Sequence, residues 1–277
     1  MAIILDGKKL REKILQDLKL KVKSFNKKPS LAVILAGDNP ASKIYVNNKK
    51  KVAEQIGINS QILNYPSTVS ENELLFKIEE LNQDKSVDAI LVQLPLPEGI
   101  SKEKIISAIH PDKDVDGFTP YNFGKLFSGE FPNVYPCTPK GILLLLEEYG
   151  IEVEGKHAVV IGRSNIVGRP MAQMLLNHNA TVTVCHSRTK NLREITKTAD
   201  IVISAVGKPI ITGEMLKQGC VVVDVGIFKD ENGKTRGDVD FDSVSKIAKY
   251  ISPVPGGVGP MTITSLMLNT VELFERK

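Results

Sequence analysis

A tyrosine and a lysine four residues apart have types and spacing that could support acid–base chemistry. Tyr45 and Lys49 lie in the segment 42–55, which is predicted to be a helix, so the two side chains share one face. A lysine beside a phenol can transfer protons if desolvation or neighbouring cations lower its pKa, and several lysines surround this one. Helix spacing alone favours a solvated basic face, but the position of the helix after a predicted strand favours a role in a cleft.

Three further features place polar or unhindered groups where a ligand could bind. Gln93 directly follows a predicted buried strand at 87–92, where its amide would either project towards a ligand or cap the strand. Asp114 and Asp116 lie in a loop, as Asx-turn residues or as carboxylates that pair with an amidine-like edge of a heterocycle. The glycine- and proline-rich run 253–260 could be a rigid turn or could let the backbone approach a flat ligand closely.

A glycine turn between a strand and a helix opens the second half of the chain. The apolar run 158–161 predicts a buried strand, Gly162 ends it, and 170–177 predicts a helix. This order is typical of a dinucleotide-binding βαβ unit. Compared with G-x-G-x-x-G, Ser164 and Val167 replace the second and third glycines, and Gly168 falls one residue late. Taken alone, the pattern fits a plain structural turn better.

The next strand indicates which dinucleotide would bind. The segment 181–185 predicts a strand, after which an acidic residue would normally bind the NAD ribose, but His186-Ser187-Arg188-Thr189 follows instead. A hydroxyl and a guanidinium suit a 2′-phosphate, so the sequence favours NADP over NAD. The alternative is that Arg188 is an ordinary solvated arginine. Arg163 in the glycine turn could converge on the same phosphate.

The elements that position these residues alternate between strand and helix, which predicts an α/β fold with parallel strands in two domains. The first domain is predicted at 1–139, with the C-terminal helix 261–277 packing back onto it, and the second at 140–260. Between them, the stretch 110–139 shows little periodicity and is predicted to be irregular, as a functional loop or a linker. Further strands are predicted at 31–36, 58–63, 201–206 and 221–225, and further helices at 8–22, from 70, at 139–149 and at 263–274.

Composition excludes several classes of protein. The chain has 277 residues, 42% of them hydrophobic and 25% charged, as expected of a globular protein. A net charge of +4 argues against a nucleic-acid surface but allows an anionic small molecule. Three widely separated cysteines and four histidines show no metal-binding spacing, so we expect no metal and a reducing compartment. No segment resembles a signal peptide or a membrane span, so a cytoplasmic location is expected.

Eight motifs, in order along essentially the whole chain, resemble those of the bifunctional methylenetetrahydrofolate dehydrogenase/methenyltetrahydrofolate cyclohydrolase family. They are Y-V-N-N-K at 45–49, V-Q-L-P-L-P at 92–97, D-K-D-V-D-G at 112–117, P-C-T-P-K-G at 136–141, G-R-S-N-I-V-G-R-P at 162–170, C-H-S-R-T at 185–189, D-V-G-I at 224–227 and P-V-P-G-G-V-G-P-M-T at 253–262.

The resemblance implies a fold of two α/β domains around a cleft, the second a Rossmann-type NADP-binding domain with a mostly parallel sheet. It also implies a homodimer formed through the cofactor domains and no attached synthetase domain. The folate side of the cleft would contain Tyr45, Lys49, Gln93, Asp116, Pro255, Gly256 and Gly257. NADP would be held by Gly162, Arg163, Ser164, Ser187, Arg188 and Ile227.

The activity implied is oxidation of 5,10-methylenetetrahydrofolate with NADP, followed by hydrolysis of the methenyl product to 10-formyltetrahydrofolate, in one-carbon metabolism. Lys49 would act as the acid–base group, Tyr45 would orient it and stack on the pterin, and Gln93 would tune it by hydrogen bonding. Asp116 would anchor the amino–imino edge of the pterin. The alternatives are another two-domain NADP-dependent dehydrogenase, such as a shikimate-type enzyme, and a non-catalytic NADP-binding regulator.

Overall fold

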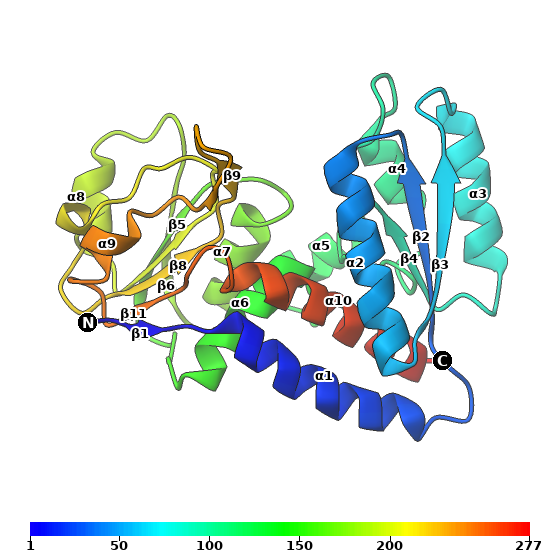
Figure 1. The fold of residues 1–277 in the computed structure, drawn as a ribbon, viewed down its shortest axis with the longest axis horizontal. Helices are drawn as coiled ribbons and strands as arrows, with labels where there is room; N and C mark the ends of the chain where they lie inside the picture. Colours follow the sequence, from blue (N-terminus) through cyan, green and yellow to red (C-terminus); the bar gives the residue numbers. More distant parts are fainter. The chain divides into compact units, whose positions relative to one another are not determined.

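The computed structural model describes all 277 residues, which form two compact units (Figure 1). Unit 1 comprises Met1–Glu12 and Thr138–Thr262, and unit 2 comprises Lys13–Cys137 and Ile263–Lys277. Two long helices, α1 (Gly7–Lys23) and α10 (Val258–Glu275), contribute residues to both units. No helix is long and apolar enough to cross a membrane.

Unit 2 is built on a three-stranded parallel sheet in the order β3-β2-β4. Its strands are β2 (Ser30–Ala36), β3 (Asn59–Tyr65) and β4 (Ala89–Val92). Its helices are α2 (Pro40–Ile56), α3 (Glu71–Gln83), α4 (Lys102–Ala108) and α5 (Pro120–Phe127).

The central strand β2 is buried on both faces, which explains its unbroken apolar sequence. Successive side chains of a strand point to opposite faces, so β2 contributes to two cores. Leu31, Val33 and Leu35 pack with residues of α1, α2 and α10. Ala32, Ile34 and Ala36 pack with residues of α3 and α4 on the other face. The sheet is therefore a layer between helices, and its strands end at a common edge.

Capping interactions set where several helices begin. The predicted start of α2 at residue 42 is two residues late, because Pro40 occupies the first turn and the Asn39 side chain accepts a hydrogen bond from Ser42 N at 3.1 Å. The predicted start of α3 at residue 70 is one residue early, because Ser70 is the cap and its Oγ accepts from Glu73 N at 3.2 Å. The prediction that 110–139 is irregular is wrong for α5, which Thr119 and Pro120 start in the same way. Helix α4 was not predicted from the sequence either.

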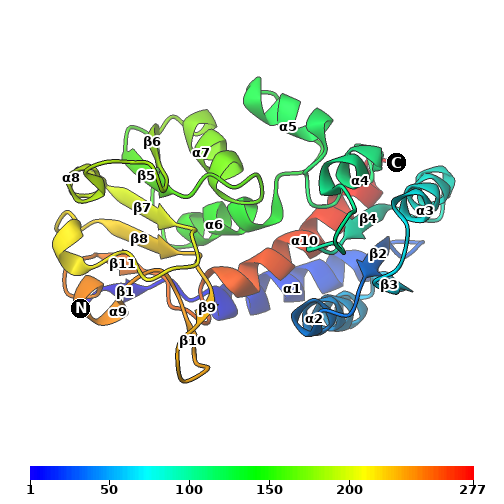
Figure 2. The same cartoon turned by 90° about the horizontal axis from the view of Figure 1, so that it is seen from above.

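Unit 1 is built on a six-stranded parallel sheet in the order β1-β11-β8-β7-β5-β6 (Figure 2). The strands are β1 (Ile3–Ile4), β11 (Tyr250–Ile251), β8 (Val221–Asp224), β7 (Ile201–Ser204), β5 (His157–Ile161) and β6 (Thr181–Cys185). The helices are α6 (Cys137–Glu148), α7 (Gly168–Asn177), α8 (Leu192–Thr196) and α9 (Phe241–Val244), with a 3₁₀ turn at Gly213–Met215. A short antiparallel hairpin joins β9 (Phe228–Lys229) to β10 (Thr235–Arg236).

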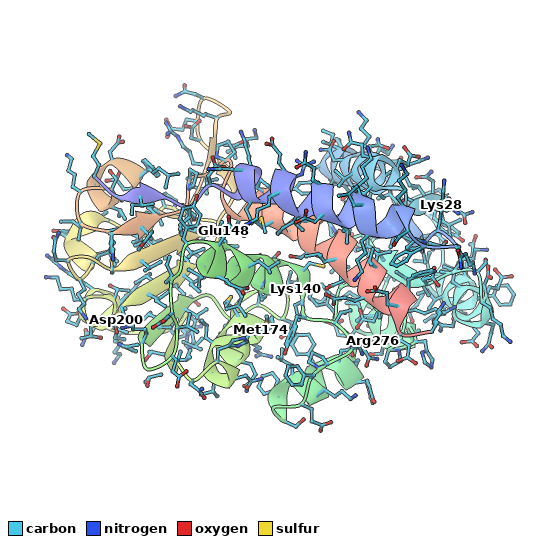
Figure 3. The ribbon with its side chains drawn as sticks, turned by 90° about the horizontal axis from the view of Figure 1, so that it is seen from below. Lys28, Lys140, Glu148, Met174, Asp200 and Arg276 are labelled. Atoms are coloured by element: carbon cyan, nitrogen blue, oxygen red, sulfur yellow. The ribbon has the colours of Figure 1, made fainter.

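The long strands of unit 1 match the prediction, whereas its shortest ones do not. Helix α7 buries Met171, Met174 and Leu175 (Figure 3 labels Met174). The two-residue strands β1, β9, β10 and β11 were not predicted, because a segment this short has no recognisable period. Both units contain parallel sheets covered by helices, so the predicted α/β fold class is confirmed.

Candidate active site

A hydrogen bond in unit 2 joins Lys49, the predicted acid–base group, to Gln93, which was predicted to tune it. Lys49 on α2 and Gln93, which follows β4, are both partly buried, and Lys49 Nζ donates to Gln93 Oε1 at 2.9 Å. The backbone of Gln93 continues the sheet, since its N donates to Ile34 O at 2.9 Å. Gln93 Nε2 donates to Leu94 O at 2.7 Å. Because this bond holds the amide, the oxygen of Gln93 is directed at Lys49.

Asp116 is partly buried in the loop after β4 and has a perturbed carboxyl group. Burial raises the pKa of Asp116 to about 6, and the Asp114 carboxylate adds to this, whereas the Lys49 charge acts in the opposite direction. The Cys137 thiol lies 3.5 Å from Asp116 Oδ1 and also favours the ionised form. Lys49 and Asp116 therefore interact electrostatically.

The neighbouring Asp114 has a structural role. It is buried, and its Oδ2 accepts hydrogen bonds from Thr119 N at 2.7 Å and Asn122 Nδ2 at 2.9 Å. These bonds fasten the start of α5 to the loop. The partners of the Asp114 carboxylate lie five and eight residues further along the chain, so these bonds are not those of an Asx turn.

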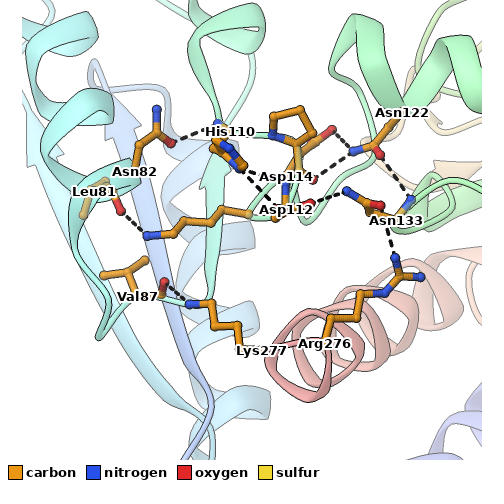
Figure 4. A network of polar contacts seen from close by, with 12 residues as sticks. Leu81, Asn82, Val87, His110, Asp112, Asp114, Asn122, Asn133, Arg276 and Lys277 are labelled. Carbon is orange, nitrogen blue, oxygen red and sulfur yellow. Dashed lines mark hydrogen bonds and ion pairs between the residues drawn. The ribbon is translucent and has the colours of Figure 1, made fainter.

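A wider polar network supports this loop (Figure 4). Lys113 Nζ donates at 2.7 Å to the carbonyl oxygens of Leu81 and Asp84, and burial, together with the charge of Lys277, lowers the pKa of Lys113. Asn133 N donates to Asn122 Oδ1 at 3.2 Å. Residues on both sides of the 114–116 segment are therefore held by buried bonds, which limits the directions that Asp116 can take.

Asn269 on α10 is a supporting residue that the sequence analysis missed. It is fully buried, and its Nδ2 donates to Val115 O at 2.8 Å and Tyr135 O at 2.9 Å, with Cys137 Sγ at 3.5 Å. The amide thus ties the residue before Asp116 to the helix. The available signal was an asparagine directly after the apolar run 266–268 of the last helix.

Tyr45 lies one helical turn before Lys49, as predicted, and its side chain is 46% exposed. The structure thus brings Lys49, Gln93 and Asp116 together and leaves the Tyr45 ring open to a ligand. No group of three or more His, Cys, Asp or Glu side chains in the structure could hold a metal ion.

In unit 1, the glycine turn after β5 is more closely packed than the motif suggested. Gly162 has φ +116°, and a Cβ there would lie 2.6 Å from Ala205 O. A Cβ on Gly168 would collide with Gly162 O. Helix α7 begins at Gly168, not at the predicted residue 170, so Gly168 is the close-packing glycine that the motif analysis had placed at Val167.

The predicted phosphate-binding residues occupy two turns at one edge of this sheet. Arg163 and Ser164 follow β5, Ser187 and Arg188 follow β6, and all four are exposed. The ends of these strands pair in register, Ile161 opposite Cys185, so both turns leave the sheet at the same level. The second turn is ordered by a 2.8 Å hydrogen bond from His186 N to Thr189 Oγ1.

Exposed apolar side chains accompany these turns. Ile227 follows β8 and is 51% exposed, and Ile166 and Val206 are 44% and 37% exposed. The polar turns and the apolar side chains together fit a dinucleotide, which has phosphates and flat rings.

Pro255, Gly256 and Gly257 lie in a tight loop of unit 1. Gly257 N donates to Pro253 O at 2.8 Å, and Gly256, with φ +117°, accepts from Lys8 N at 3.2 Å. A Cβ on Gly7 would collide with Gly257 O, so the start of α1 rests directly on this backbone. The loop is thus a fixed surface and not a flexible linker.

Comparisons with known proteins agree on one family. The profile "Tetrahydrofolate dehydrogenase/cyclohydrolase, catalytic domain" matches residues 5–116, and the profile for the "NAD(P)-binding domain" of the same family matches residues 136–277. The chain is 55% identical to the "Bifunctional protein FolD" of Lactococcus lactis subsp. lactis (strain IL1403), covering 99% of this chain and 98% of that protein.

Two solved structures extend the likeness to the fold. The bifunctional FolD methylenetetrahydrofolate dehydrogenase/cyclohydrolase of Campylobacter jejuni is 52% identical with a TM-score of 0.96, and each chain is covered completely. The Trypanosoma brucei methylenetetrahydrofolate dehydrogenase-cyclohydrolase, solved with NADP and an inhibitor, is 38% identical with a TM-score of 0.94, covering 99% and 98% of the two chains. The chain therefore belongs to the tetrahydrofolate dehydrogenase/cyclohydrolase family, and the family predicted from its motifs is confirmed.

Proposed function

We propose that the chain oxidises 5,10-methylenetetrahydrofolate to 5,10-methenyltetrahydrofolate with NADP and hydrolyses the product to 10-formyltetrahydrofolate. The observation that supports the second activity best is the Lys49–Gln93 hydrogen bond beside Asp116. A lysine directed by an amide and facing a carboxyl group of altered pKa suits proton transfer better than simple binding. We assign unit 2 to the folate and unit 1 to NADP.

Oxidation needs positioning more than acid–base help. The product cation is stabilised by the adjacent nitrogens, and bound NADP supplies the hydride acceptor. Asp116 fixes the pterin by accepting hydrogen bonds from its amino–imino edge, for which the ionised form is required. The exposed Tyr45 ring stacks on the pterin, and contact of the 255–257 backbone with the folate stays a prediction.

Hydrolysis needs proton transfer. Water adds to the methenyl carbon and loses a proton, which gives a neutral carbinolamine. The bond to ring nitrogen N5 then breaks as that nitrogen gains a proton and the new hydroxyl loses its own to become the formyl oxygen, so one proton is released overall. Lys49 is placed to accept the first proton and return it to N5. Gln93 keeps the Lys49 side chain in this orientation through the 2.9 Å hydrogen bond.

The cofactor assignment rests on the turns after β5 and β6. Ser187 and Arg188 supply a hydroxyl and a guanidinium for the 2′-phosphate, Gly162, Arg163 and Ser164 receive the pyrophosphate, and Ile227 borders a ring. The Trypanosoma brucei relative was solved with NADP. We further propose a homodimer formed through unit 1 and a cytoplasmic location.

One pair of assays tests this function. NADPH formation that depends on methylenetetrahydrofolate, followed by decay of the methenyl absorbance, is the expected result. A shikimate-type dehydrogenase would show neither signal with folate, and a non-catalytic regulator would bind NADP without turnover. NADPH formation without decay of the methenyl absorbance would show that the chain has the dehydrogenase activity but not the cyclohydrolase activity.

A further inference from the structure

Two buried carboxylates lie behind the proposed cofactor edge of unit 1. Asp224 ends β8 and is 4% exposed, and Asp238 follows β10 and is completely buried. Asp224 begins the D-V-G-I motif at 224–227 but was given no role there, and neither carboxylate has a part in the mechanism above. The hydrogen-bond partners of both are neutral N–H and O–H groups.

Asp238 holds the loop that follows β7. Its Oδ2 accepts from Ser204 Oγ at 2.8 Å and Val206 N at 2.7 Å, and its Oδ1 accepts from Lys208 N at 2.8 Å. This loop touches the glycine turn, because a Cβ on Gly162 would lie 2.6 Å from Ala205 O. One side chain therefore fixes the backbone that closes one side of the proposed pyrophosphate site.

Asp224 holds Asp238 and the loop that follows β8. Its Oδ1 accepts from Asp238 N at 2.8 Å and from Gly226 N at 3.1 Å, and its Oδ2 accepts from Val239 N at 3.0 Å. Gly226 directly precedes the exposed Ile227. The two carboxylates thus connect both loops that flank the site.

Two glycines make room for the carboxylates. A Cβ on Gly226 would collide with the Asp238 carboxylate, and a Cβ on Gly237 would collide with the Asp224 carboxylate. Each aspartate therefore packs on a glycine beside the other aspartate. This reciprocal arrangement leaves little freedom for either side chain to move.

Burying two neighbouring carboxylates costs desolvation free energy, which a purely structural connection between loops does not require. Burial, opposed by the backbone donors and reinforced by the charge of Asp238, raises the pKa of Asp224 to about 7. Apolar or neutral side chains would hold a structural loop without that desolvation. Strong acceptors are justified where several backbone donors must be held in one arrangement for a ligand.

We infer that Asp238 is a positioning residue for NADP, and that it acts by holding the loop 205–208 against the Gly162 turn in the arrangement that the cofactor binds. The inference rests on the proposed function of unit 1. Without Asp238, part of the binding free energy of NADP is used to order the loop. The affinity for NADP therefore drops, while the folate chemistry of unit 2 is unaffected.

The test is Asp238→Asn, which keeps the size but replaces one acceptor oxygen by a donor. NADP dissociation constants and cyclohydrolase kcat/KM are measured on the same full-length protein. The dissociation constant should rise about 10- to 100-fold, as expected for the loss of a hydrogen bond to a charged group. Dehydrogenase KM for NADP should rise with it, whereas cyclohydrolase kcat/KM should stay within about twofold.

The control is Asp200→Asn, at the opposite end of β7 (labelled in Figure 3). Asp200 accepts from His157 N at 3.0 Å and Lys217 Nζ at 2.6 Å, so its loss should lower Tm without changing NADP affinity. Equal shifts of NADP affinity in both variants, or equal loss of both activities in Asp238→Asn, would overturn the inference.

If Asp238→Asn does not fold, Ser204→Ala decides, because it removes only one of the three donors to Asp238. A rise of about two- to fivefold in the NADP dissociation constant supports the inference, and an unchanged constant contradicts it. Failure of the unsubstituted protein to bind NADP would instead refute the proposed function, before any variant is compared.

Discussion

Lys49 Nζ donates a 2.9 Å hydrogen bond to Gln93 Oε1 and so links a helix that follows one strand to the residue that directly follows another. Parallel strands end at a common edge, which is why two residues 44 positions apart meet there. The bond orients the lysine, since the other end of the Gln93 amide is held by Leu94 O at 2.7 Å.

Gln93→Leu removes this acceptor at nearly constant size. Cyclohydrolase kcat should fall about 10- to 100-fold, because a hydrogen bond to a charged group contributes about 1.5–3 kcal/mol. Steady-state decay of methenyltetrahydrofolate measures the effect. Gln83→Leu is the matched control, since the Gln83 amide bonds Glu79 on the exposed side of α3 and should not affect activity. An unchanged kcat in Gln93→Leu would show that Gln93 does not orient Lys49 for catalysis.

Asp116→Asn should weaken folate binding, depress both activities together and leave NADP affinity unchanged. In the unsubstituted protein, kcat/KM for the folate should fall as pH drops through about 6, because protonation of Asp116 removes an acceptor. A pH profile of the variant should lack this step. NADP affinity that falls in parallel with folate affinity would indicate a structural role in the loop instead.

The same substitution should stabilise the fold at alkaline pH. The pKa of Asp116 is raised to about 6 in the folded protein, so its stabilising contribution is present below its ordinary pKa and is lost as pH rises through about 6. Urea unfolding at about pH 8 should show Asp116→Asn more stable by about 1–2 kcal/mol, reduced for partial exposure, with a smaller difference near pH 4.5. A constant difference at both pH values would argue against the shifted carboxyl group.

Arg188→Ala should raise KM for NADP far more than KM for NAD. A guanidinium bound to the 2′-phosphate contributes about 1.5–3 kcal/mol, and NAD lacks that phosphate. Initial rates with each cofactor give the comparison. Arg193→Ala, which removes an exposed arginine paired with Glu214 at 3.2 Å, is the control and should change neither value. An unchanged preference in Arg188→Ala would direct attention to Arg163.

Gly168→Ala should destabilise the protein by about 1–3 kcal/mol, because its Cβ would collide with Gly162 O and force the start of α7 away from the turn. Thermal unfolding and NADP binding should both be impaired. Gly124→Ala in α5 is the control, since a Cβ there meets no atom within 4 Å and alanine favours a helix. Equal stability of the two variants would show that α7 does not need this glycine.

Site residues could be predicted from the sequence where the residues next to them in the chain determine whether they lie in a helix or after a strand. Tyr45 and Lys49 share a helix face because four residues make about one turn, and Gln93 follows a strand that is recognisable by its apolar run. The family motifs gave Asp116 a role, but only the structure separates it from Asp114, whose partners Thr119 and Asn122 belong to a helix that was not predicted.

The supporting residues could not be predicted, because their partners are distant in the chain. Asn269 meets Val115 across 154 positions, and Asp238 meets Ser204 across 34. Neither contact leaves a periodic or spaced pattern in the sequence. The role of Gly168 was not predicted for a related reason. This glycine allows two backbone segments to pack closely, and a motif of fixed spacing does not show which residue does so.

The most direct test of the account is Lys49→Gln, with Lys50→Gln as the control. Lys50 is the next residue on α2 and lies 3.8 Å from Glu54, so its loss should change neither activity. Glutamine at position 49 can still donate a hydrogen bond but cannot exchange a proton at neutral pH.

Both activities are measured on the same folded Lys49→Gln preparation, checked by circular dichroism. Cyclohydrolase activity should fall about 10²- to 10⁴-fold, the range for lost acid–base catalysis, while dehydrogenase activity persists and methenyltetrahydrofolate accumulates. Equal loss of both activities would make Lys49 a binding or structural residue, and retained cyclohydrolase activity would contradict its place in the mechanism.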